Sequence, residues 1–202
     1  YIWHMGTSSQ KRRYLPHLVA GDMISAIAMT EAGAGSDLQG IRTTAVKKAD
    51  GSGYVLNGSK TYITNGFLSD LVIVVARTDL DAKAAHGTSL FLVEATSVGF
   101  SKGQPLKKMG LKAQDTCELF FEDVELPLDA LLGDEHRGFH YLMNELPQER
   151  LMIAVEGQAR AENAFEATRR WCSERVAFGK PLFAKQAVQH KLADMKTSIC
   201  VN

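Results

Sequence analysis

The sequence predicts an α+β protein in which a small antiparallel β-barrel or sandwich domain is followed by long antiparallel helices of an incomplete helical bundle. Two observations predict this class. Between residues 23 and 133, short apolar runs of strand length alternate with turn residues, and no long helical pattern intervenes. From residue 134 onward, apolar and small side chains recur instead with a helical period. A shorter helical segment, residues 1–22, precedes both parts.

The segment 1–22 has the end signals of a helix. Thr7 followed by Gln10 matches a capping box, and Gly21 is a residue that often ends a helix. Pro16 lies between these signals, and proline removes a backbone donor from a helix interior. We therefore expect Pro16 to break the segment in two.

The β domain is predicted from individual runs. Residues 24–30 form one strand, and residues 71–77 and 89–95 are apolar runs of buried-strand length. Asn57-Gly58 stands between two strand-like runs, which predicts a tight hairpin turn there. Residues 117–127 mix apolar and acidic residues and end at a proline, as a half-buried strand does.

Two helices are predicted after residue 134. The first is expected to have Pro147 in its first turn, where a missing N–H costs little, and residues 178–181 break it. Its apolar or small positions are Ala154, Ala161, Phe165, Thr168 and Cys172. The second helix carries Val188, Leu192, Met195 and Ile199 on one stripe. A short connection between two long helices predicts an antiparallel pair.

Composition excludes several function classes. The chain has 202 residues, of which 45% are hydrophobic and 23% charged, so it can bury a core. Lys+Arg and Asp+Glu both number 23, and the formal net charge of +0 gives no reason to expect a nucleic acid or an anionic membrane as partner. No apolar run approaches the roughly 18 residues of a membrane span. The first residue is not Met and the last residues continue a helical pattern, so we expect a part of a longer protein.

The cysteines and histidines predict neither a disulfide framework nor a metal site. Cys117, Cys172 and Cys200 are an odd number at wide spacings, which favours a reducing compartment. The six histidines are scattered, and no pair has the spacing of metal ligands. A GxSxG nucleophile motif is also absent from the sequence, which argues against an esterase.

The glycine-containing stretch 28–40 is the first candidate for a ligand-binding loop. Gly33 and Gly35 fit the first two positions of a dinucleotide fingerprint, but Leu38 occupies the third, and no Walker lysine follows. Thr30 and Ser36, which belong to this loop, and Tyr62 and Thr64 further along the chain place hydroxyl groups at strand ends. Such hydroxyls can pair with a heterocycle or with phosphate oxygens. The simpler interpretation of the loop alone is a surface turn that Ser36 caps.

Four segments together resemble one enzyme family. Residues 29–40 (MTEAGAGSDLQG), 57–66 (NGSKTYITNG), 109–127 (MGLKAQDTCELFFEDVELP) and 174–182 (ERVAFGKPL) have the order and spacing found in acyl-CoA dehydrogenases. The resemblance covers essentially all 202 residues but only the middle of a family subunit. It implies that residues 1–22 end an N-terminal helical domain, 23–133 form the middle β domain, and 134–202 begin the C-terminal helical bundle.

The resemblance implies FAD as cofactor. Met29 and Thr30 would contact the flavin ring, Tyr62 would stack on it, and Thr64 would bond near flavin N5. Gly35 and Ser36 would lie where the pyrophosphate and the CoA chain pass. The full implied set in the β domain is Met29, Thr30, Gly35, Ser36, Tyr62, Ile63 and Thr64. Arg175, Phe178 and Gln186 would reach the FAD of a neighbouring subunit, which implies a homodimer or homotetramer.

The resemblance also implies substrate contacts and a catalytic base. Ser36, Ala85, His86, Pro147, Gln148 and Arg150 would contact acyl-CoA. Long-chain and isovaleryl types place the catalytic glutamate on the bundle helix directly before an arginine, which here selects Glu149. Glu145, one helical turn earlier, is the natural competitor.

The implied function is α,β-dehydrogenation of an acyl-CoA with a long acyl chain to the trans-2-enoyl-CoA in fatty acid β-oxidation. Electrons would pass to an electron-transferring flavoprotein, in the bacterial cytoplasm or the mitochondrial matrix. Two alternatives stay open at this point. One is an acyl-CoA oxidase-like flavoenzyme, which would pass electrons to oxygen, and the other is an inactive fragment of the dehydrogenase.

Overall fold

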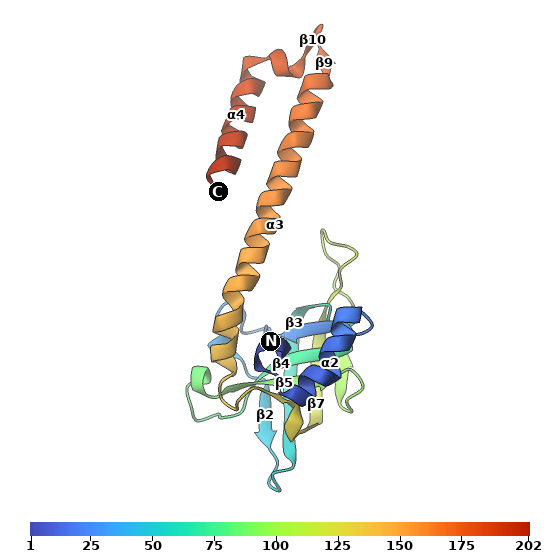
Figure 1. The fold of residues 1–202 in the computed structure, drawn as a ribbon, viewed down its shortest axis with the longest axis vertical. Coiled ribbons are helices and arrows are strands. Elements are labelled where there is room, and N and C mark those ends of the chain that lie inside the picture. The colour runs from blue at the N-terminus through green and yellow to red at the C-terminus, as the bar shows by residue number, and fades with distance from the viewer. The chain divides into compact units, whose positions relative to one another are not determined.

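A computed structural model describes the backbone of residues 1–202 and all side chains except that of residue 84. The chain divides into two compact units, Tyr1–Asn144 and Glu145–Asn202. The first unit holds two short N-terminal helices and a β-sheet, and the second holds a pair of antiparallel helices (Figure 1). The α+β class predicted from the sequence is confirmed.

The first unit is built on one eight-stranded sheet. Its strands are β1 (Ser25–Ala28), β2 (Thr44–Lys47), β3 (Gly53–Thr64), β4 (Leu71–Arg77), β5 (Thr88–Glu94), β6 (Phe100–Lys102), β7 (Thr116–Pro127) and β8 (Leu131–Leu132). The order is β6-β7-β3-β2-β4-β5-β8, with β1 paired to β4. This path is open, so the strands do not close into the barrel that was one of the two expected forms. The sheet is also mixed, because β1 and β2 both pair with β4 in parallel.

The core of this unit lies on the central strands. Leu71–Ala76 of β4 and Thr88–Val93 of β5 are buried on both faces, as their continuous apolar sequences require. The long strands β3 and β7 alternate more between buried and exposed residues. Tyr54 of β3 packs edge-on against Phe91 of β5, with ring centroids 4.9 Å apart. This packing gives β3 a fixed support.

The predicted hairpin at Asn57-Gly58 is wrong. Strand β3 runs straight through both residues, and its register against β7 shifts between Leu56 and Gly58, which marks a β-bulge. Gly58 has φ +145, and the Asn57 side chain bonds to Asp123 of β7 on both its amide and its carbonyl side. The extra residue of this bulge lies on β7, and Gly58 instead lets β3 pass close to Thr43. Long-range pairing with β7 overrides the local turn preference.

The hairpin lies seven residues earlier, between β2 and β3. The Lys48 N–H donates to the Gly53 carbonyl and the Gly51 N–H to the Lys48 carbonyl. Asp50 accepts bonds from the backbone and side chain of Ser52, and Gly51 has φ +72. Asp-Gly is also a hairpin signal, and this is the one that the fold uses.

The N-terminal helices are α1 (Ile2–Met5) and α2 (Ser8–Ala20). The Thr7–Gln10 capping box and the left-handed Gly21 that ends α2 are both confirmed. The expected break at Pro16 is wrong, because Pro16 lies inside a continuous α2.

The packing of α2 explains why the proline is tolerated. Tyr14 is buried, and Gln10 Nε2 donates to the carbonyls of Asp129 and Leu131 at 2.8 and 2.9 Å. These contacts offset the single backbone bond that Pro16 removes. The chain breaks instead at Gly6, where a Cβ would lie 2.4 Å from the Ile2 carbonyl oxygen.

The second unit contains most of α3 (Gly138–Glu174), the short strands β9 (Val176–Ala177) and β10 (Lys180–Pro181), and α4 (Gln186–Val201). The expectation that Pro147 starts the first helix is wrong, because α3 begins nine residues earlier at Gly138. Leu142, in the first turns, is fully buried in the first unit. That burial fixes the helical conformation before the proline is reached.

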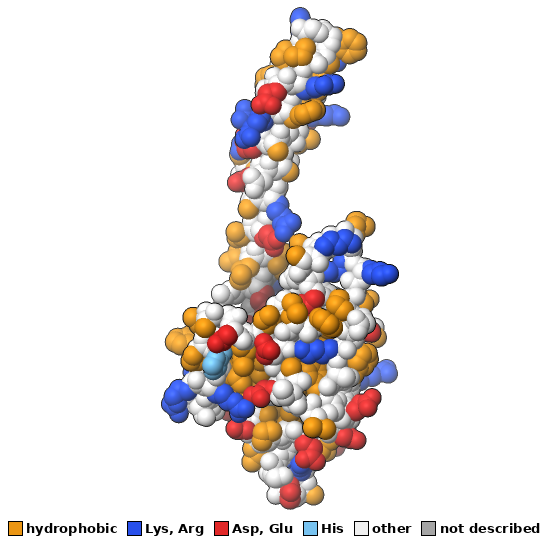
Figure 2. All heavy atoms as spheres, turned by 90° about the vertical axis from the view of Figure 1, so that its right-hand side faces the viewer, with side chains coloured by type: hydrophobic (Ala, Val, Ile, Leu, Met, Phe, Trp, Pro, Cys, Tyr) orange, Lys and Arg blue, Asp and Glu red, His pale blue; other side chains and the backbone are white. Residues whose placement is uncertain are grey.

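The predicted antiparallel helix pair is confirmed (Figure 1). Phe165 and Cys172 of α3 pack with Leu192 of α4, and Gln158 Nε2 donates to the Ile199 carbonyl at 2.7 Å. Hydrophobic side chains remain on the surface of this unit between charged ones (Figure 2). Exposed examples on α3 are Leu151, Met152, Ile153 and Val155. In the described part of the chain, no helix has the length and apolar character needed to span a bilayer.

Candidate functional site

The loop after β1 is shaped by a tight reversal. Glu31 and Ala34 form an antiparallel bridge with N–O distances of 2.8 and 3.1 Å, and a short 3-10 turn, Leu38–Gly40, follows. A Cβ on Gly33 would meet nothing within 4 Å, and one on Gly35 would meet only Thr30 Cγ2 at 3.9 Å. Packing within the chain therefore does not require glycine at either position. The two glycines leave an open backbone surface that a ligand can approach.

Tyr62 is presented by a bulge in β3. The register against β7 shifts between Lys60 and Ile63, so Thr61 and Tyr62 are the residues without a regular partner. Tyr62 has φ +57, an uncommon conformation for an aromatic residue, and its side chain is 68% exposed. Bulges re-aim side chains, and strained residues cluster at functional sites. Ile63, the next residue, points into the core.

The end of β3, where Thr64 lies, is held by Asp115. The Asn65 N–H donates to the Asp115 carbonyl at 3.2 Å, and the Phe67 N–H donates to the Asp115 carboxylate at 2.7 Å. Thr64 itself pairs with Thr116 of β7. The segment 109–127 thus fixes the turn that carries Thr64, and the sequence analysis did not single out Asp115.

The loop 28–40 and strand β3 are joined directly. The Thr61 N–H donates to the Thr30 carbonyl at 2.9 Å, next to the bulge that presents Tyr62. Lys60 Nζ donates to the Met29 carbonyl at 3.0 Å and to Glu31 Oε1 at 2.9 Å. Of the positions implied by the resemblance, the structure therefore brings together Met29, Thr30 and Tyr62 within the first unit.

Lys60 and Glu31 form a buried ion pair that the sequence analysis missed. The Lys60 side chain is 0% exposed and the Glu31 side chain 9%. Burial lowers the pKa of Lys60 to about 8, against the opposing effect of the Glu31 carboxylate. Burial raises the pKa of Glu31, but the Lys60 ammonium and hydrogen bonds from Thr43 and Arg42 outweigh it, and the pKa lies below its usual value. A lysine on the buried face of a strand was the available signal.

A second loop, residues 78–87, is strongly preorganised. Arg77 Nη2, with two N–H groups, lies within hydrogen-bonding distance of three carbonyl oxygens of the loop, those of Asp79, Leu80 and Ala82. The Asp79 carboxylate accepts from the N–H groups of Asp81 and Ala82, and these bonds lower its pKa. The loop therefore holds its shape through its own polar groups.

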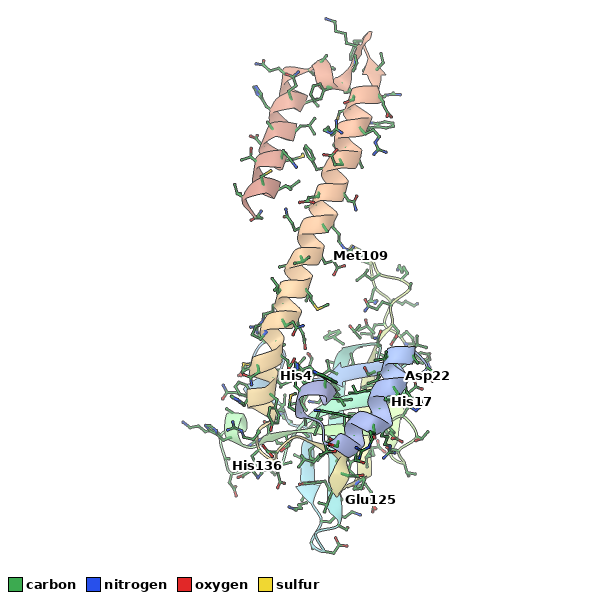
Figure 3. The ribbon with its side chains drawn as sticks, in the orientation of Figure 1. His4, His17, Asp22, Met109, Glu125 and His136 are labelled. Carbon is green, nitrogen blue, oxygen red and sulfur yellow. The ribbon has the colours of Figure 1, made fainter. Side chains whose placement is uncertain are left out.

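The far end of this loop carries Ala85 and His86 in a 3-10 turn, Ala84–His86. Thr78 Oγ1 lies 2.7 Å from Ser89 Oγ and 2.9 Å from His136 Nδ1. His136, labelled in Figure 3, precedes α3 and also donates its N–H to Ser89 Oγ. This hydroxyl–imidazole cluster fastens the base of the loop on which the expected CoA contacts lie.

The expected base and its neighbours lie in the second unit. Pro147, Gln148, Glu149 and Arg150 are consecutive residues of α3, and Glu149 is half-buried while the other three are exposed. Glu145 is also half-buried and lies four residues earlier on the same helix. The structure therefore places both candidate carboxylates on one face of α3.

Arg175, Phe178 and Gln186 lie around the connection between α3 and α4. The backbone carbonyl of Arg175 accepts from the Leu182 N–H at 2.8 Å across this connection, and Gln186 is the first residue of α4. Phe178 and Gly179 have φ +54 and +75 in the turn between β9 and β10, and Phe178 is 94% exposed. A left-handed, exposed aromatic residue is costly unless another surface receives it.

The fold and the site define a protein class in which a β domain with open, preorganised loops precedes a helical domain. Residues 26–124 match the family model "Acyl-CoA dehydrogenase, middle domain", and residues 136–202 match "Acyl-CoA dehydrogenase, C-terminal domain". The chain belongs to the acyl-CoA dehydrogenase family.

Three similar proteins illustrate the relationship. The long-chain specific acyl-CoA dehydrogenase of Mus musculus mitochondria is 60% identical over 202 residues, which is 100% of this chain and 46% of that protein. The crystal structure of an acyl-CoA dehydrogenase from Geobacillus kaustophilus is 50% identical with a TM-score of 0.96, over 100% of this chain and 53% of the other. A chain from a structure described as the electron transferring flavoprotein of Acidaminococcus fermentans is 40% identical with a TM-score of 0.92, over 99% and 52%. The chain thus spans about half the length of these relatives.

Proposed function

We propose that this chain is the central part of an FAD-dependent acyl-CoA dehydrogenase that converts a long-chain acyl-CoA to its trans-2-enoyl-CoA in fatty acid β-oxidation. The observation that carries the proposal is the joining of loop 28–40 to β3 through Thr30, Thr61 and Lys60, because it gathers the expected flavin contacts in one place. The 60% identity with the mouse long-chain enzyme supports the substrate class.

The residues of the first unit fit a flavin. Gly33 and Gly35 leave room for a phosphate-bearing chain, and the exposed Tyr62 ring offers a stacking surface. Thr30 and Thr64 supply hydroxyl groups that can bond the polar edge of a heterocycle. Bound FAD would supply the acceptor for the hydride from the substrate β carbon. Met29, Ser36 and Ile63 complete the proposed cofactor set, and Ser36 also contacts substrate.

Glu149 is the proposed general base, which takes the proton from the substrate α carbon. Glu149 is half-buried on α3, so it is partly shielded from water and still accessible to a substrate, as a general base must be. Pro147, Gln148 and Arg150 would contact the acyl chain beside it. Ala85 and His86, on the preorganised loop 78–87, would contact the CoA part.

The proposal includes an assembly and an electron acceptor. Arg175, Phe178 and Gln186 would bind the FAD of a second subunit in a homodimer or homotetramer, and an arginine is a suitable partner for a pyrophosphate. An electron-transferring flavoprotein would take the electrons. The relatives are mitochondrial in mouse and bacterial in Geobacillus, which supports the mitochondrial matrix or the bacterial cytoplasm as location.

The test uses the complete protein that contains this segment. The parent should show bound-flavin absorbance, and a long-chain acyl-CoA should bleach it without oxygen. Glu149→Gln should still bind FAD and acyl-CoA but lose about 10²–10⁴-fold in turnover. Glu145→Gln, one turn away on the same helix, is the matched control and should stay close to the parent.

Other outcomes would redirect the proposal. Full turnover in Glu149→Gln, with loss in Glu145→Gln, would transfer the base to Glu145. Retained turnover in both variants would place the base outside this segment. Rapid reoxidation of the reduced flavin by oxygen would indicate an oxidase, and absence of flavin in the parent would contradict the flavoenzyme assignment.

A further inference from the structure

Lys60 is unusual because its charged side chain has no exposure to solvent. Burying an ammonium group is costly unless it is paired and hydrogen-bonded. Lys60 meets that requirement with two bonds, to the Met29 carbonyl and to Glu31 Oε1. Both partners belong to the loop 28–40, and neither belongs to the sheet that surrounds β3.

The partner carboxylate is itself fixed. Glu31 Oε2 accepts from the Arg42 N–H at 2.6 Å, and Oε1 accepts from the Thr43 N–H at 3.0 Å. The backbone of Glu31 forms both bonds of the bridge to Ala34. Through Glu31, Lys60 is therefore connected to two parts of the chain: the loop residues Glu31–Ala34, and Arg42 and Thr43 before β2.

The pair lies directly beside the residues expected to contact the flavin. Met29 and Glu31 flank Thr30, whose carbonyl accepts from Thr61, the residue after Lys60. Tyr62, in the strained conformation, is the next residue along β3. Two consecutive residues of the strand thus hold three consecutive residues of the loop.

Stability alone does not account for this arrangement. Replacing a buried ion pair by well-packed apolar residues is often neutral or stabilising, so a purely structural role does not call for these charges. Charged hydrogen bonds are strongly directional, whereas apolar contacts tolerate small shifts. An ion pair at this point specifies where the Met29 and Thr30 backbone lies relative to Tyr62.

We propose that Lys60 and Glu31 are a positioning pair that fixes the loop residues Met29–Glu31 against the Tyr62–Thr64 end of β3 and so sets the geometry of the flavin contacts. This inference rests on the proposed function. It adds a role for two residues that would touch neither flavin nor substrate. Loss of the pair changes how the flavin is held more than it changes whether the sheet folds.

The test uses the complete flavoprotein and four variants. Lys60→Met leaves the buried Glu31 carboxylate without its ammonium and is expected to lower the melting temperature. The double variant Lys60→Met with Glu31→Gln removes both charges, and its single amide oxygen can still accept from one of the two N–H groups, Arg42 or Thr43, that in the parent bond to separate carboxylate oxygens. Glu31→Gln alone leaves the buried Lys60 ammonium without its counter-charge, so it is also expected to lower the melting temperature. Lys48→Met is the control, because it breaks the ion pair between Lys48, the residue after β2, and Glu125 of β7.

The double variant should recover part of the melting temperature lost in Lys60→Met, because it removes the unpaired buried charge but leaves one backbone N–H without its acceptor. Its dissociation constant for FAD should nevertheless rise at least about tenfold, as losses of supporting groups around a site typically do. Its bound-flavin visible band should change in shape. Glu31→Gln should fold and shift both flavin readouts in the same direction, while Lys48→Met should shift neither.

The positioning role is overturned if the double variant and Glu31→Gln bind FAD with the affinity and visible spectrum of the parent. It is also overturned if Lys48→Met changes those readouts as much. Should the double variant not fold, Glu31→Gln alone decides between the same two outcomes. A parent that bound no flavin would overturn the proposed function and this inference together.

Discussion

Gly58 tests whether the close approach of β3 to Thr43 requires a glycine. Its φ of +145 lies in a region that side chains rarely adopt. A Cβ there would lie 2.6 Å from Thr43 Oγ1 and 2.7 Å from Thr43 Cα. Because Thr43 Cα belongs to the backbone, it cannot move aside as a flexible side chain would. Gly58→Ala therefore combines backbone strain with steric overlap.

Two other glycines separate these effects. Gly51 has φ +72 but open space around it, so Gly51→Ala introduces strain without overlap. Gly33 has open space and no positive φ, so Gly33→Ala introduces neither. A left-handed conformation costs an L-residue roughly 1–2 kcal/mol, and overpacking costs about 1–3 kcal/mol. We expect Gly58→Ala to lose about 2–5 kcal/mol, Gly51→Ala roughly 1–2 kcal/mol, and Gly33→Ala to stay near the parent or gain up to about 1 kcal/mol.

The measurement is urea unfolding of the complete protein and the three variants, followed by circular dichroism. The free energy of unfolding should fall in the order Gly33→Ala, Gly51→Ala, Gly58→Ala, with similar slopes against urea concentration. The difference between the last two isolates the overlap with Thr43. A Gly58→Ala protein as stable as Gly51→Ala would refute the reasoning, because the close approach of β3 to Thr43 would then carry no cost.

Three further predictions concern the site. Gly35→Val should fold, since only Thr30 Cγ2 lies within 4 Å of the added Cβ. It should nevertheless abolish FAD retention. Normal flavin content, measured by absorbance, would contradict a cofactor contact at this loop. Arg175→Ala should weaken FAD binding and weaken the association of subunits, because a phosphate charge loses its partner. An FAD affinity from titration calorimetry and a sedimentation profile that both match the parent would show that Arg175 is only a solvated charge. The lowered pKa of Glu31 means that its ionised form stabilises the folded state. This contribution to the free energy of unfolding is complete above pH 4.5, the ordinary pKa, and is lost as the pH falls through the lowered pKa. The free energy of unfolding of the parent should therefore decrease as the pH falls below 4.5, and that of the Glu31→Gln variant should decrease less. Equal acid sensitivity in urea unfolding would exclude this role of the Glu31–Lys60 pair.

The elements that could be predicted from the sequence are those specified by nearby residues. The Thr7–Gln10 capping box and the glycine that ends α2 are local signals, and both hold in the structure. The continuous apolar runs of β4 and β5 have no other stable location than the centre of a sheet. The break between the two long helices likewise follows from the glycine and proline of residues 178–181.

The errors came from positions where distant contacts outweigh local preference. Asn57-Gly58 is a strong turn signal in isolation, but pairing of β3 with β7 continues past it. Pro16 and Pro147 disfavour a helix interior, yet the buried anchors of α2 and of the first turns of α3 keep both helices continuous. A local penalty of about 3 kcal/mol for a proline is smaller than what several buried side chains contribute.

The sequence motifs of the candidate site could be predicted, but the distant residues that hold those motifs in place could not. Sequence patterns placed Thr30, Tyr62 and Thr64 at strand ends, and they lie there. The left-handed conformation of Tyr62 depends on a bulge that pairing with β7 creates. Asp115, which holds the turn after Thr64, acts across a separation of 48 residues from Phe67. No local pattern contains that information.

Lys60 shows how a residue that holds a site loop in place could be recognised from the sequence. In β3 it has the same parity as Tyr54 and Leu56, which are both buried, so alternation alone predicts that its side chain points inward. Its residue type predicts the opposite, because lysine is almost never fully buried without a partner. The two rules can hold together only if a carboxylate is buried beside it, and Glu31, 29 residues earlier, satisfies that condition. Conflicts of this kind between position and residue type are expected at functional sites, and here the conflict lies beside the residues that the resemblance assigns to the flavin.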